Sequence, residues 1–214
     1  MTDNIHSAVG GNDPDEYATV SGEREAEIKV QGSRFIAFLR PLADVAEFHD
    51  WLTTVRKRFH DATHHCYAYR IGARGETWRT SDDGEPSGTA GARILEAMAS
   101  RDLVYCGVIV VRYFGGTKLG VGGLGRAYFN AARAVVERAR VERRYITLTC
   151  RIHFPFSHTQ TVHRALEKFS CRIVDQDYGD VVTYTVRIRR SLVTQLESWL
   201  TDQSAGVVVL EQNL

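Results

Sequence analysis

Apolar residues recur at spacings of three and four between Val45 and Phe59, which is the period of an amphipathic helix. Asp44 stands directly before this run and can cap the start of the helix. Residues 64–72 instead alternate between two faces, and residues 105–114 form a nearly continuous apolar run. Such a run is typical of a strand at the centre of a sheet. The first two thirds of the chain therefore combine strands with helices.

The last third has its own regular order of elements. The pattern predicts, in order, a strand at 142–154, a helix at 158–169, a hairpin at 171–190, a helix at 191–202 and a closing strand at 206–212. This β-α-β-β-α-β order is the split βαβ pattern of a ferredoxin-like domain. We therefore predict an α+β chain in which residues 1–17 form a disordered tail, residues 18–142 a first domain and residues 143–214 a second.

Composition narrows the class of protein. The chain has 214 residues, of which 43% are hydrophobic and 25% charged, as in soluble globular proteins. Its net charge of +1 argues against a general nucleic-acid coat, so any phosphate contact must come from a local patch. The N-terminus lacks a secretory signal and no window reaches the ~18 apolar residues of a membrane span. We expect a cytoplasmic protein with no membrane partner and with four reduced, unpaired cysteines.

The stretch VRYFGGTKLGVGGLGRAYFN, residues 111–130, places six glycines between an expected strand and a helix predicted from Leu124 to Arg140. It contains the letters GxGxxG, but GGTKL separates them from the strand, and the order does not match a P-loop. One interpretation remains an anion site at a helix N-terminus. The other is that glycine permits positive φ and close packing. The candidate anion ligands are Arg112, Gly115, Gly116, Lys118, Gly120, Gly122, Gly123 and Arg126.

The loop TSDDGEPSGTAG, residues 80–91, is dense in carboxylates and turn-forming residues. Carboxylates this close repel one another unless a cation or hydrogen-bond donors offset them. Three interpretations stay open: a metal site, a turn or clamp salt-bridged to Arg112 or Arg93, and a loop that contacts a ligand. Ser87 or Thr89 can cap the next helix, predicted from Thr89 to Ala99. The candidate surface residues are Asp82, Asp83, Glu85, Ser87 and Thr89. We expect this loop to border Gly115–Gly123.

No catalytic set stands out. His64 and His65 are neighbours on one strand and point to opposite faces, which favours core or surface histidines over zinc ligands and leaves their role open. The chain has no Gly-x-Ser-x-Gly nucleophile motif, and we assign neither catalytic residues, nor a metal, nor a cofactor, with Mg²⁺ as a minor alternative at the acidic loop. Arginines gather at 138–144 and at 187–190. These two clusters are either phosphate-contacting surfaces or solvated ends of elements.

Four segments carry a family resemblance: GSRFIA at 32–37, HHCYAYRIG at 64–72, SDDGEPSGTAG at 81–91 and VRYFGGTKLGVGGL at 111–124. Together they resemble the IMPACT/YigZ family. The amino-terminal partner-binding domain of eukaryotic IMPACT has no counterpart here, so the chain is similar to the bacterial YigZ type. The resemblance implies a first domain like ribosomal protein S5 domain 2 and a ferredoxin-like second domain.

The resemblance also implies a functional context. The two folds in this order are similar to the last two domains of translation elongation factor G, and eukaryotic relatives regulate translation initiation. We therefore expect a non-enzymatic regulator that binds RNA, the ribosome or a translation-related protein, without DNA sequence specificity. One alternative is an enzyme or binding protein for a phosphorylated small molecule or nucleotide. Another is a protein-interaction module. The oligomeric state stays open.

Overall fold

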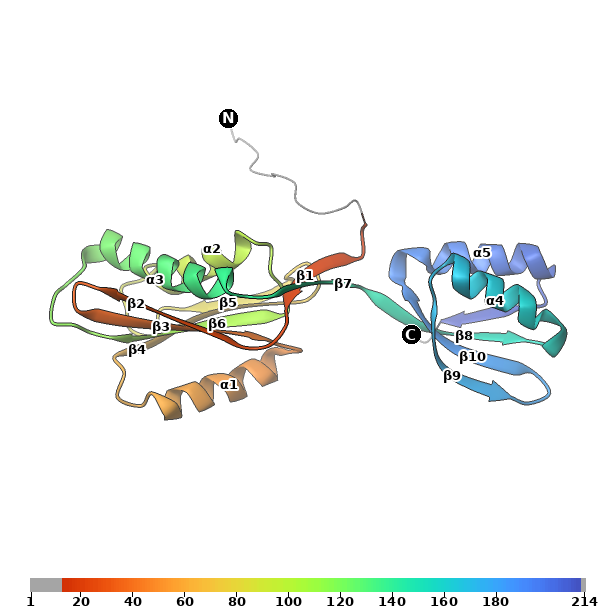
Figure 1. The fold of residues 1–214 in the computed structure, drawn as a ribbon, viewed down its shortest axis with the longest axis horizontal. Coiled ribbons are helices and arrows are strands. Elements are labelled where there is room, and N and C mark those ends of the chain that lie inside the picture. Colours follow the sequence, from red (N-terminus) through yellow and green to blue (C-terminus); the bar gives the residue numbers. More distant parts are fainter. Residues whose placement is uncertain (1–12, 213–214) are drawn as a thin grey trace, which may run out of the picture. The chain divides into compact units, whose positions relative to one another are not determined.

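The computed structural model describes residues 13–212 and shows an α+β protein of two compact units, which confirms the predicted fold class (Figure 1). The N-terminal unit comprises Tyr17–Arg144. The C-terminal unit begins at Tyr145 and also includes the described residues that precede Tyr17. All four cysteines are free thiols, as predicted.

A five-stranded sheet forms the centre of the N-terminal unit. Its order is β2 (Arg24–Val30), β3 (Ser33–Pro41), β6 (Cys106–Tyr113), β4 (His64–Ile71) and β5 (Thr77–Ser81). Each neighbouring pair is antiparallel. The apolar run predicted as a central strand is β6, which is buried along nearly its whole length because both faces of the sheet are covered.

Helices cover the two faces of this sheet unequally. α1 (Val45–Arg58) lies on one face, whereas α2 (Gly91–Ala99) and α3 (Gly120–Glu137) lie side by side on the other (Figure 1). The alternation along β4 follows this arrangement, since Cys66 joins the core under α2 and α3 and Tyr67 joins the core under α1. Asp44 caps α1 as predicted, accepting a hydrogen bond from the Glu47 amide at 2.8 Å.

The segment before the sheet is more ordered than predicted. Residues 1–12 of the predicted tail lie outside the described residues, but β1 (Glu16–Val20) pairs with β7 (Val141–Tyr145) in a two-stranded sheet. Asp15 is only 1% exposed and accepts a hydrogen bond from the Ser191 amide at 2.7 Å. The predicted tail is therefore wrong for residues 13–17, because long-range pairing fixes them and local composition does not reveal it.

The C-terminal unit has the predicted β-α-β-β-α-β order. Its elements are β8 (Thr147–Phe154), α4 (Thr159–Lys168), β9 (Arg172–Tyr178), β10 (Val182–Arg189), α5 (Val193–Ser204) and β11 (Val209–Gln212), with short 3₁₀ turns at Phe156–His158 and Arg190–Leu192. The sheet order is β11-β8-β10-β9, the arrangement of a ferredoxin-like fold. Both helices pack on one face of this sheet and close a separate core (Figure 1).

Two boundaries differ from the sequence prediction. The strand predicted at 142–154 is divided into β7 and β8 at Ile146, whose amide donates to the carbonyl of Asp15 at 2.9 Å. α3 begins at Gly120 instead of Leu124, so that several glycines of the motif belong to the helix. Among residues 13–212, none of the helices combines the length and the apolar character needed to cross a bilayer.

Candidate functional site

Asp82 organises the start of α2. Its carboxylate accepts hydrogen bonds from the amides of Gly88 at 2.8 Å, and of Ala90 and Gly91 at 2.9 Å each. Burial raises the pKa of the Asp82 carboxyl, but the three backbone hydrogen bonds together lower this pKa by more than burial raises it. The net pKa therefore lies below the usual value. Asp82 thus satisfies helix amides that Ser87 or Thr89 was expected to cap.

Asp83 holds the acidic loop against α1 and β4. One carboxylate oxygen lies 2.6 Å from Nη2 of Arg56, and the other accepts the amide hydrogen of His65 at 2.7 Å. The Nδ1 atom of His64 lies 2.8 Å from the Asp83 carbonyl oxygen, and Nε2 of His65 lies 3.1 Å from the carbonyl of Phe59. Burial lowers the pKa of His65. Both histidines therefore have backbone partners, as expected for structural residues.

Glu85 points into the protein. Its Oε1 atom lies 2.6 Å from Nη1 of Arg112 and accepts a hydrogen bond from the Tyr128 hydroxyl at 2.7 Å. The side chains of Arg112 and Glu85 are 7% and 4% exposed. This pairing bears out the clamp interpretation of the acidic loop. Of the candidate anion ligands, Arg112 is thus buried and already neutralised by a carboxylate, and it does not line the cavity described below.

The three carboxylates of the loop do not converge. Each has a different set of donors from the chain itself, so their mutual repulsion is offset without a cation. Within the part of the chain that the structure describes, no group of three or more His, Cys, Asp or Glu side chains is arranged to hold a metal ion. The hydrogen bonds and ion pairs of the candidate residues Asp82, Asp83 and Glu85 therefore fix the position of the loop.

The glycines divide into two groups. Gly115 packs directly on Gly32, and a Cβ atom at Gly115 would lie 1.9 Å from the Gly32 carbonyl carbon. Its amide donates to Oγ of Ser33 at 3.1 Å. Gly116 has φ +86, a conformation that favours glycine. Gly115 and Gly116 therefore fit the interpretation that glycine is needed for close packing and positive φ. Both lie where β6 passes into the loop.

The second group lies in the first turn of α3. Gly120 and Gly122 are exposed, and Leu119 gives the helix no side-chain cap. The amides of residues 120–122 have no hydrogen-bond partner elsewhere in the described chain. A helix that begins without a cap presents these amides, together with its partial positive charge, to solvent. Gly120 also has φ +68, a conformation that favours glycine, so both interpretations apply to it. For Gly122 and the half-buried Gly123, the anion interpretation stays open.

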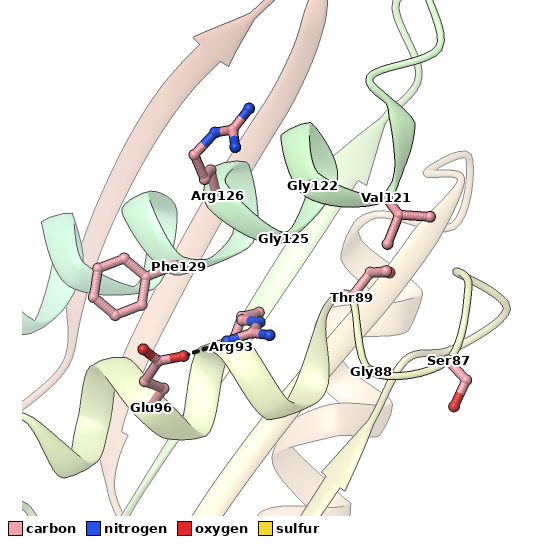
Figure 2. Close-up of a pocket in the computed structure, with 10 residues that line it drawn as sticks. All are labelled: Ser87, Gly88, Thr89, Arg93, Glu96, Val121, Gly122, Gly125, Arg126 and Phe129. Atoms are coloured by element: carbon pink, nitrogen blue, oxygen red, sulfur yellow. Dashed lines mark hydrogen bonds and ion pairs between the residues drawn. The ribbon is translucent and has the colours of Figure 1, made fainter.

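A cavity of about 630 Å³ lies beside this turn, between α2 and α3 (Figure 2). Its lining residues are Ser87, Gly88, Thr89, Arg93, Glu96, Val121, Gly122, Gly125, Arg126 and Phe129. The cavity places the acidic loop next to the glycine-rich segment, which confirms that the two motifs border each other. Figure 2 shows Arg93 and Glu96 of α2 facing Phe129 of α3.

The charges around the cavity are uneven. Arg126 lies beside Gly122 at the first turn of α3, and a Cβ atom at Gly122 would lie 3.6 Å from its Nη1 atom. Arg93 forms an ion pair with Glu96 at 2.8 Å, so the charge of Arg93 is already neutralised by a carboxylate. Lys118 is exposed near this turn but does not line the cavity. Arg126 is therefore a cationic side chain beside the open amides, and Lys118 is an exposed cation two residues before the helix begins.

Six lining residues were absent from the predicted site residues: Gly88, Arg93, Glu96, Val121, Gly125 and Phe129. Glu96 lines the cavity because α2 packs against α3, and the sequence does not show which face of α2 makes this contact. Phe129 is five positions from Leu124, outside the predicted loop, and its half-buried ring lines the cavity only because α2 and α3 lie in contact. Val121 is exposed, but single exposed apolar side chains are ordinary on protein surfaces, so the sequence contains no signal for these residues.

Together these features define a two-domain α+β protein in which a carboxylate-rich loop is clamped beside a glycine-rich helix start. Family comparison assigns the same two parts. The Impact N-terminal domain matches residues 31–136, and a domain of unknown function, DUF1949, matches residues 152–207. The chain belongs to the IMPACT family.

Relatives align over nearly the whole chain. IMPACT family member YvyE from Bacillus subtilis is 30% identical over 89% of this chain and 88% of its own length. IMPACT family member YigZ from Escherichia coli is 30% identical over 85% of this chain and 90% of its own. A crystal structure of a hypothetical protein covers 94% of this chain and 98% of its own, with 25% identity and a TM-score of 0.66.

Proposed function

We propose that this chain is a non-enzymatic, cytoplasmic regulator associated with translation, and that it binds RNA, free or in the ribosome, through the surface around the start of α3. The observation that carries the proposal is the open first turn of α3. Its amides have no partner in residues 13–212, and Arg126 and Lys118 lie close by. Open amides and cationic side chains are the groups that bind phosphate oxygens.

The geometry of the acidic loop favours a binding role over a catalytic one. A general acid or a metal-ligating carboxylate needs access to its substrate. Glu85 is instead buried against Arg112, and Asp82 is engaged by three backbone amides. In this proposal the loop is a rigid support that fixes α2 beside α3, and the binding groups lie on α3 and the residues just before it.

RNA binding as a function of salt tests the proposal. The variant K118Q/R126Q removes both nearby cations, and K57Q/R79Q removes one lysine and one arginine that are exposed elsewhere on the same unit. We expect K118Q/R126Q to weaken binding of a short RNA and to flatten the dependence of log K on log salt by about 1.4 to 1.8. The control should match the wild type. Equal binding by K118Q/R126Q and the wild type at every salt concentration would overturn the proposal.

A second candidate follows from the cavity itself. A volume of about 630 Å³ lies within the range of ~300–1,000 Å³ common for small-molecule sites. The same amides and Arg126 would then hold the phosphate of a small molecule or nucleotide. Thermal unfolding with a panel of nucleotides and sugar phosphates tests this candidate, since a ligand at 100 times its Kd stabilises by about 2.7 kcal/mol. A flat response combined with RNA binding would favour the first function.

A further inference from the structure

The cavity between α2 and α3 is bordered by residues that have no side chains. Gly122 and Gly125 are three positions apart on one face of α3, and Gly88 lines the cavity from the loop before α2. A Cβ atom at Gly125 would lie 3.7 Å from Nε of Arg93 and 3.9 Å from the carbonyl oxygen of Thr89, so α2 approaches α3 closely at this point. The glycines therefore leave a space that longer side chains surround.

α2 and α3 run in the same direction, so the two ends of the cavity are different. Arg93 and Gly125 meet near the starts of the two helices. Just beyond the end of α2, Nη1 of Arg101 donates to the carbonyl oxygen of Val136 near the end of α3 at 2.8 Å. The first turn of α3 thus lies at one end of the cavity, and the later turns lie towards the other.

The chemistry of the cavity changes from one end to the other. The open amides and Arg126 make the first turn of α3 cationic. Phe129 packs against the core under α2 and α3 but stays half-buried, and its ring lines the cavity (Figure 2). Seven residues separate Gly122 from Phe129, which is about 10 Å along the helix axis at ~1.5 Å per residue.

The other cations near the ring already have counter-ions. The guanidinium carbon of Arg133 lies 6.0 Å from the ring centre of Phe129, but Arg133 pairs with Glu137 at 3.5 Å. Arg93 is neutralised as well, by the ion pair described above. Arg126 makes no ion pair within residues 13–212. An anionic group is therefore bound best at the first turn of α3, and the flat ring of Phe129 is left for another part of the same ligand.

A nucleotide combines these two features in one molecule. Its phosphate is the group that open helix amides and a guanidinium bind. Its base is a flat ring that stacks on aromatic side chains whatever its sequence. The length of a nucleotide from the phosphate to the far edge of the base is close to the separation of the two ends, and the cavity of about 630 Å³ has room for it. A sugar phosphate would leave the ring of Phe129 unused.

The base must be unpaired to reach the ring. Within a double helix each base is covered on both faces by its neighbours, and proteins contact single bases only in loops, bulges, ends or flipped positions. A space between two packed helices admits such a base and excludes a base pair that stays stacked in its duplex.

We propose that the cavity binds one unpaired nucleotide, with its phosphate at Arg126 and the first turn of α3 and its base stacked on Phe129. The assignment of this nucleotide to an RNA strand rests on the function proposed above. The position of the base rests on the cavity and the ring. A free nucleotide has the same chemistry, and direct binding distinguishes it from RNA.

Substitution of the ring tests the proposal. F129L keeps an apolar side chain but removes the ring, and it should weaken binding of a single-stranded RNA of about six nucleotides by about 5-fold or more. Its salt dependence should equal that of the wild type, because no charge is removed. F129Y, which keeps the ring, should bind as the wild type does. The control F59L removes a half-buried ring from the α1 face of the same unit and should leave binding unchanged.

A second measurement needs no variant. The ring protons of Phe129 should shift upfield in the NMR spectrum of the wild type when the single-stranded RNA is added, because a stacked base shields them. A fully paired duplex should leave these signals in place. Circular dichroism establishes that each variant is folded, and the wild-type spectrum decides if F129L is not.

The outcomes separate this inference from the proposed function. If K118Q/R126Q weakens RNA binding while folded F129L binds as the wild type and the ring signals stay in place, this inference is wrong and the proposed function stands. An equal response of the ring signals to the duplex would overturn the assignment to an unpaired nucleotide.

Nucleoside monophosphates and ribose 5-phosphate complete the test. A wild-type chain that binds no RNA, but is stabilised by a nucleoside monophosphate more than by ribose 5-phosphate and only while Phe129 is present, would overturn the proposed function and leave a free nucleotide as the ligand of the cavity. A chain that binds neither RNA nor a nucleoside monophosphate contradicts both proposals.

Discussion

The guanidinium of Arg112 lies 2.6 Å from the carboxylate of Glu85, and this ion pair is buried between the sheet and α3. Arg112 comes from β6 and Glu85 from the loop before α2. Tyr128 of α3 donates its hydroxyl hydrogen to the same carboxylate oxygen at 2.7 Å. One carboxylate thus ties the central strand, the acidic loop and α3 together, and fixes the geometry of the neighbouring cavity.

Removing the charge of Glu85 should destabilise the N-terminal unit strongly. In E85Q the guanidinium of Arg112 stays buried without a counter-ion, and the loss of one partner of a buried pair costs about 3–5 kcal/mol. Urea unfolding monitored by circular dichroism measures this free energy.

The matched control is E96Q on α2. Its carboxylate pairs with Arg93 on the surface, with the Glu96 side chain 54% exposed, so the expected loss is about 0.5 kcal/mol or less. The double variant E85L/R112M should recover much of the stability lost in E85Q, because it removes both buried charges. A loss within about 1 kcal/mol for E85Q would show that the pair is not required for folding.

Asp82 should make the free energy of unfolding depend on pH in the acidic range. The net pKa of its carboxyl is lowered in the folded protein, so the ionised form is favoured by folding. The resulting stabilisation is fully present above the unfolded-state pKa of about 3.9 and is lost as pH falls through the lower folded value. D82N should therefore be less stable than the wild type at neutral pH, and the difference should shrink below about pH 4.

Thermal or urea unfolding across pH checks this prediction, with D177N as the control. Asp177 is exposed on β9 and its side chain makes no hydrogen bond or ion pair within the described residues, so D177N should follow the wild type across the range. A constant difference between D82N and the wild type from neutral to acidic pH would contradict the role of the charged carboxylate.

Two glycines of the same motif should respond oppositely to alanine. A Cβ atom at Gly115 would strike the backbone of Gly32, which cannot yield without moving the β2–β3 turn, so G115A should lose about 3 kcal/mol or more. At Gly122 the nearest atom is the flexible end of Arg126 at 3.6 Å, and the residue is helical. G122A should be neutral or stabilising by up to about 1 kcal/mol. Midpoints of thermal unfolding compare the two, and equal values would refute the division of the glycines.

Much of the fold could be predicted from local patterns. The apolar run of β6, the capped helix after Asp44 and the β-α-β-β-α-β order of the last third each express a periodicity in neighbouring residues. The division of the strand at Ile146 could not be predicted in this way, because its cause is a hydrogen bond to Asp15, far away in the sequence. The order of residues 13–17 escaped prediction for the same reason.

The candidate site was predicted in part. The sequence identified both motifs and their neighbourhood, since the ends of strands and helices that follow one another around a sheet often gather their loops at one edge; in the structure the two loops follow β5 and β6, which β4 separates. It did not reveal that Asp82 satisfies amides eight and nine residues ahead, which depends on the exact path of the loop. Nor could it show whether Arg112 points to the surface or inward to Glu85, because neighbouring strand positions differ only in which face they occupy.

Arg172 should be a position where substitution stabilises the protein. The sheet register pairs Arg172 of β9 directly with Arg187 of β10, neither has a counter-ion in the described chain, and like charges in this arrangement cost about 0.2–1 kcal/mol. R172Q should therefore raise the unfolding free energy of the C-terminal unit by a few tenths of a kcal/mol, most clearly at low salt, because salt screens exposed charges. Hydrogen exchange of amides in β9 and β10 measures this change within the unit. R164Q on α4 should change the same amides little, and a loss of protection in R172Q would mean that this arginine stabilises the sheet.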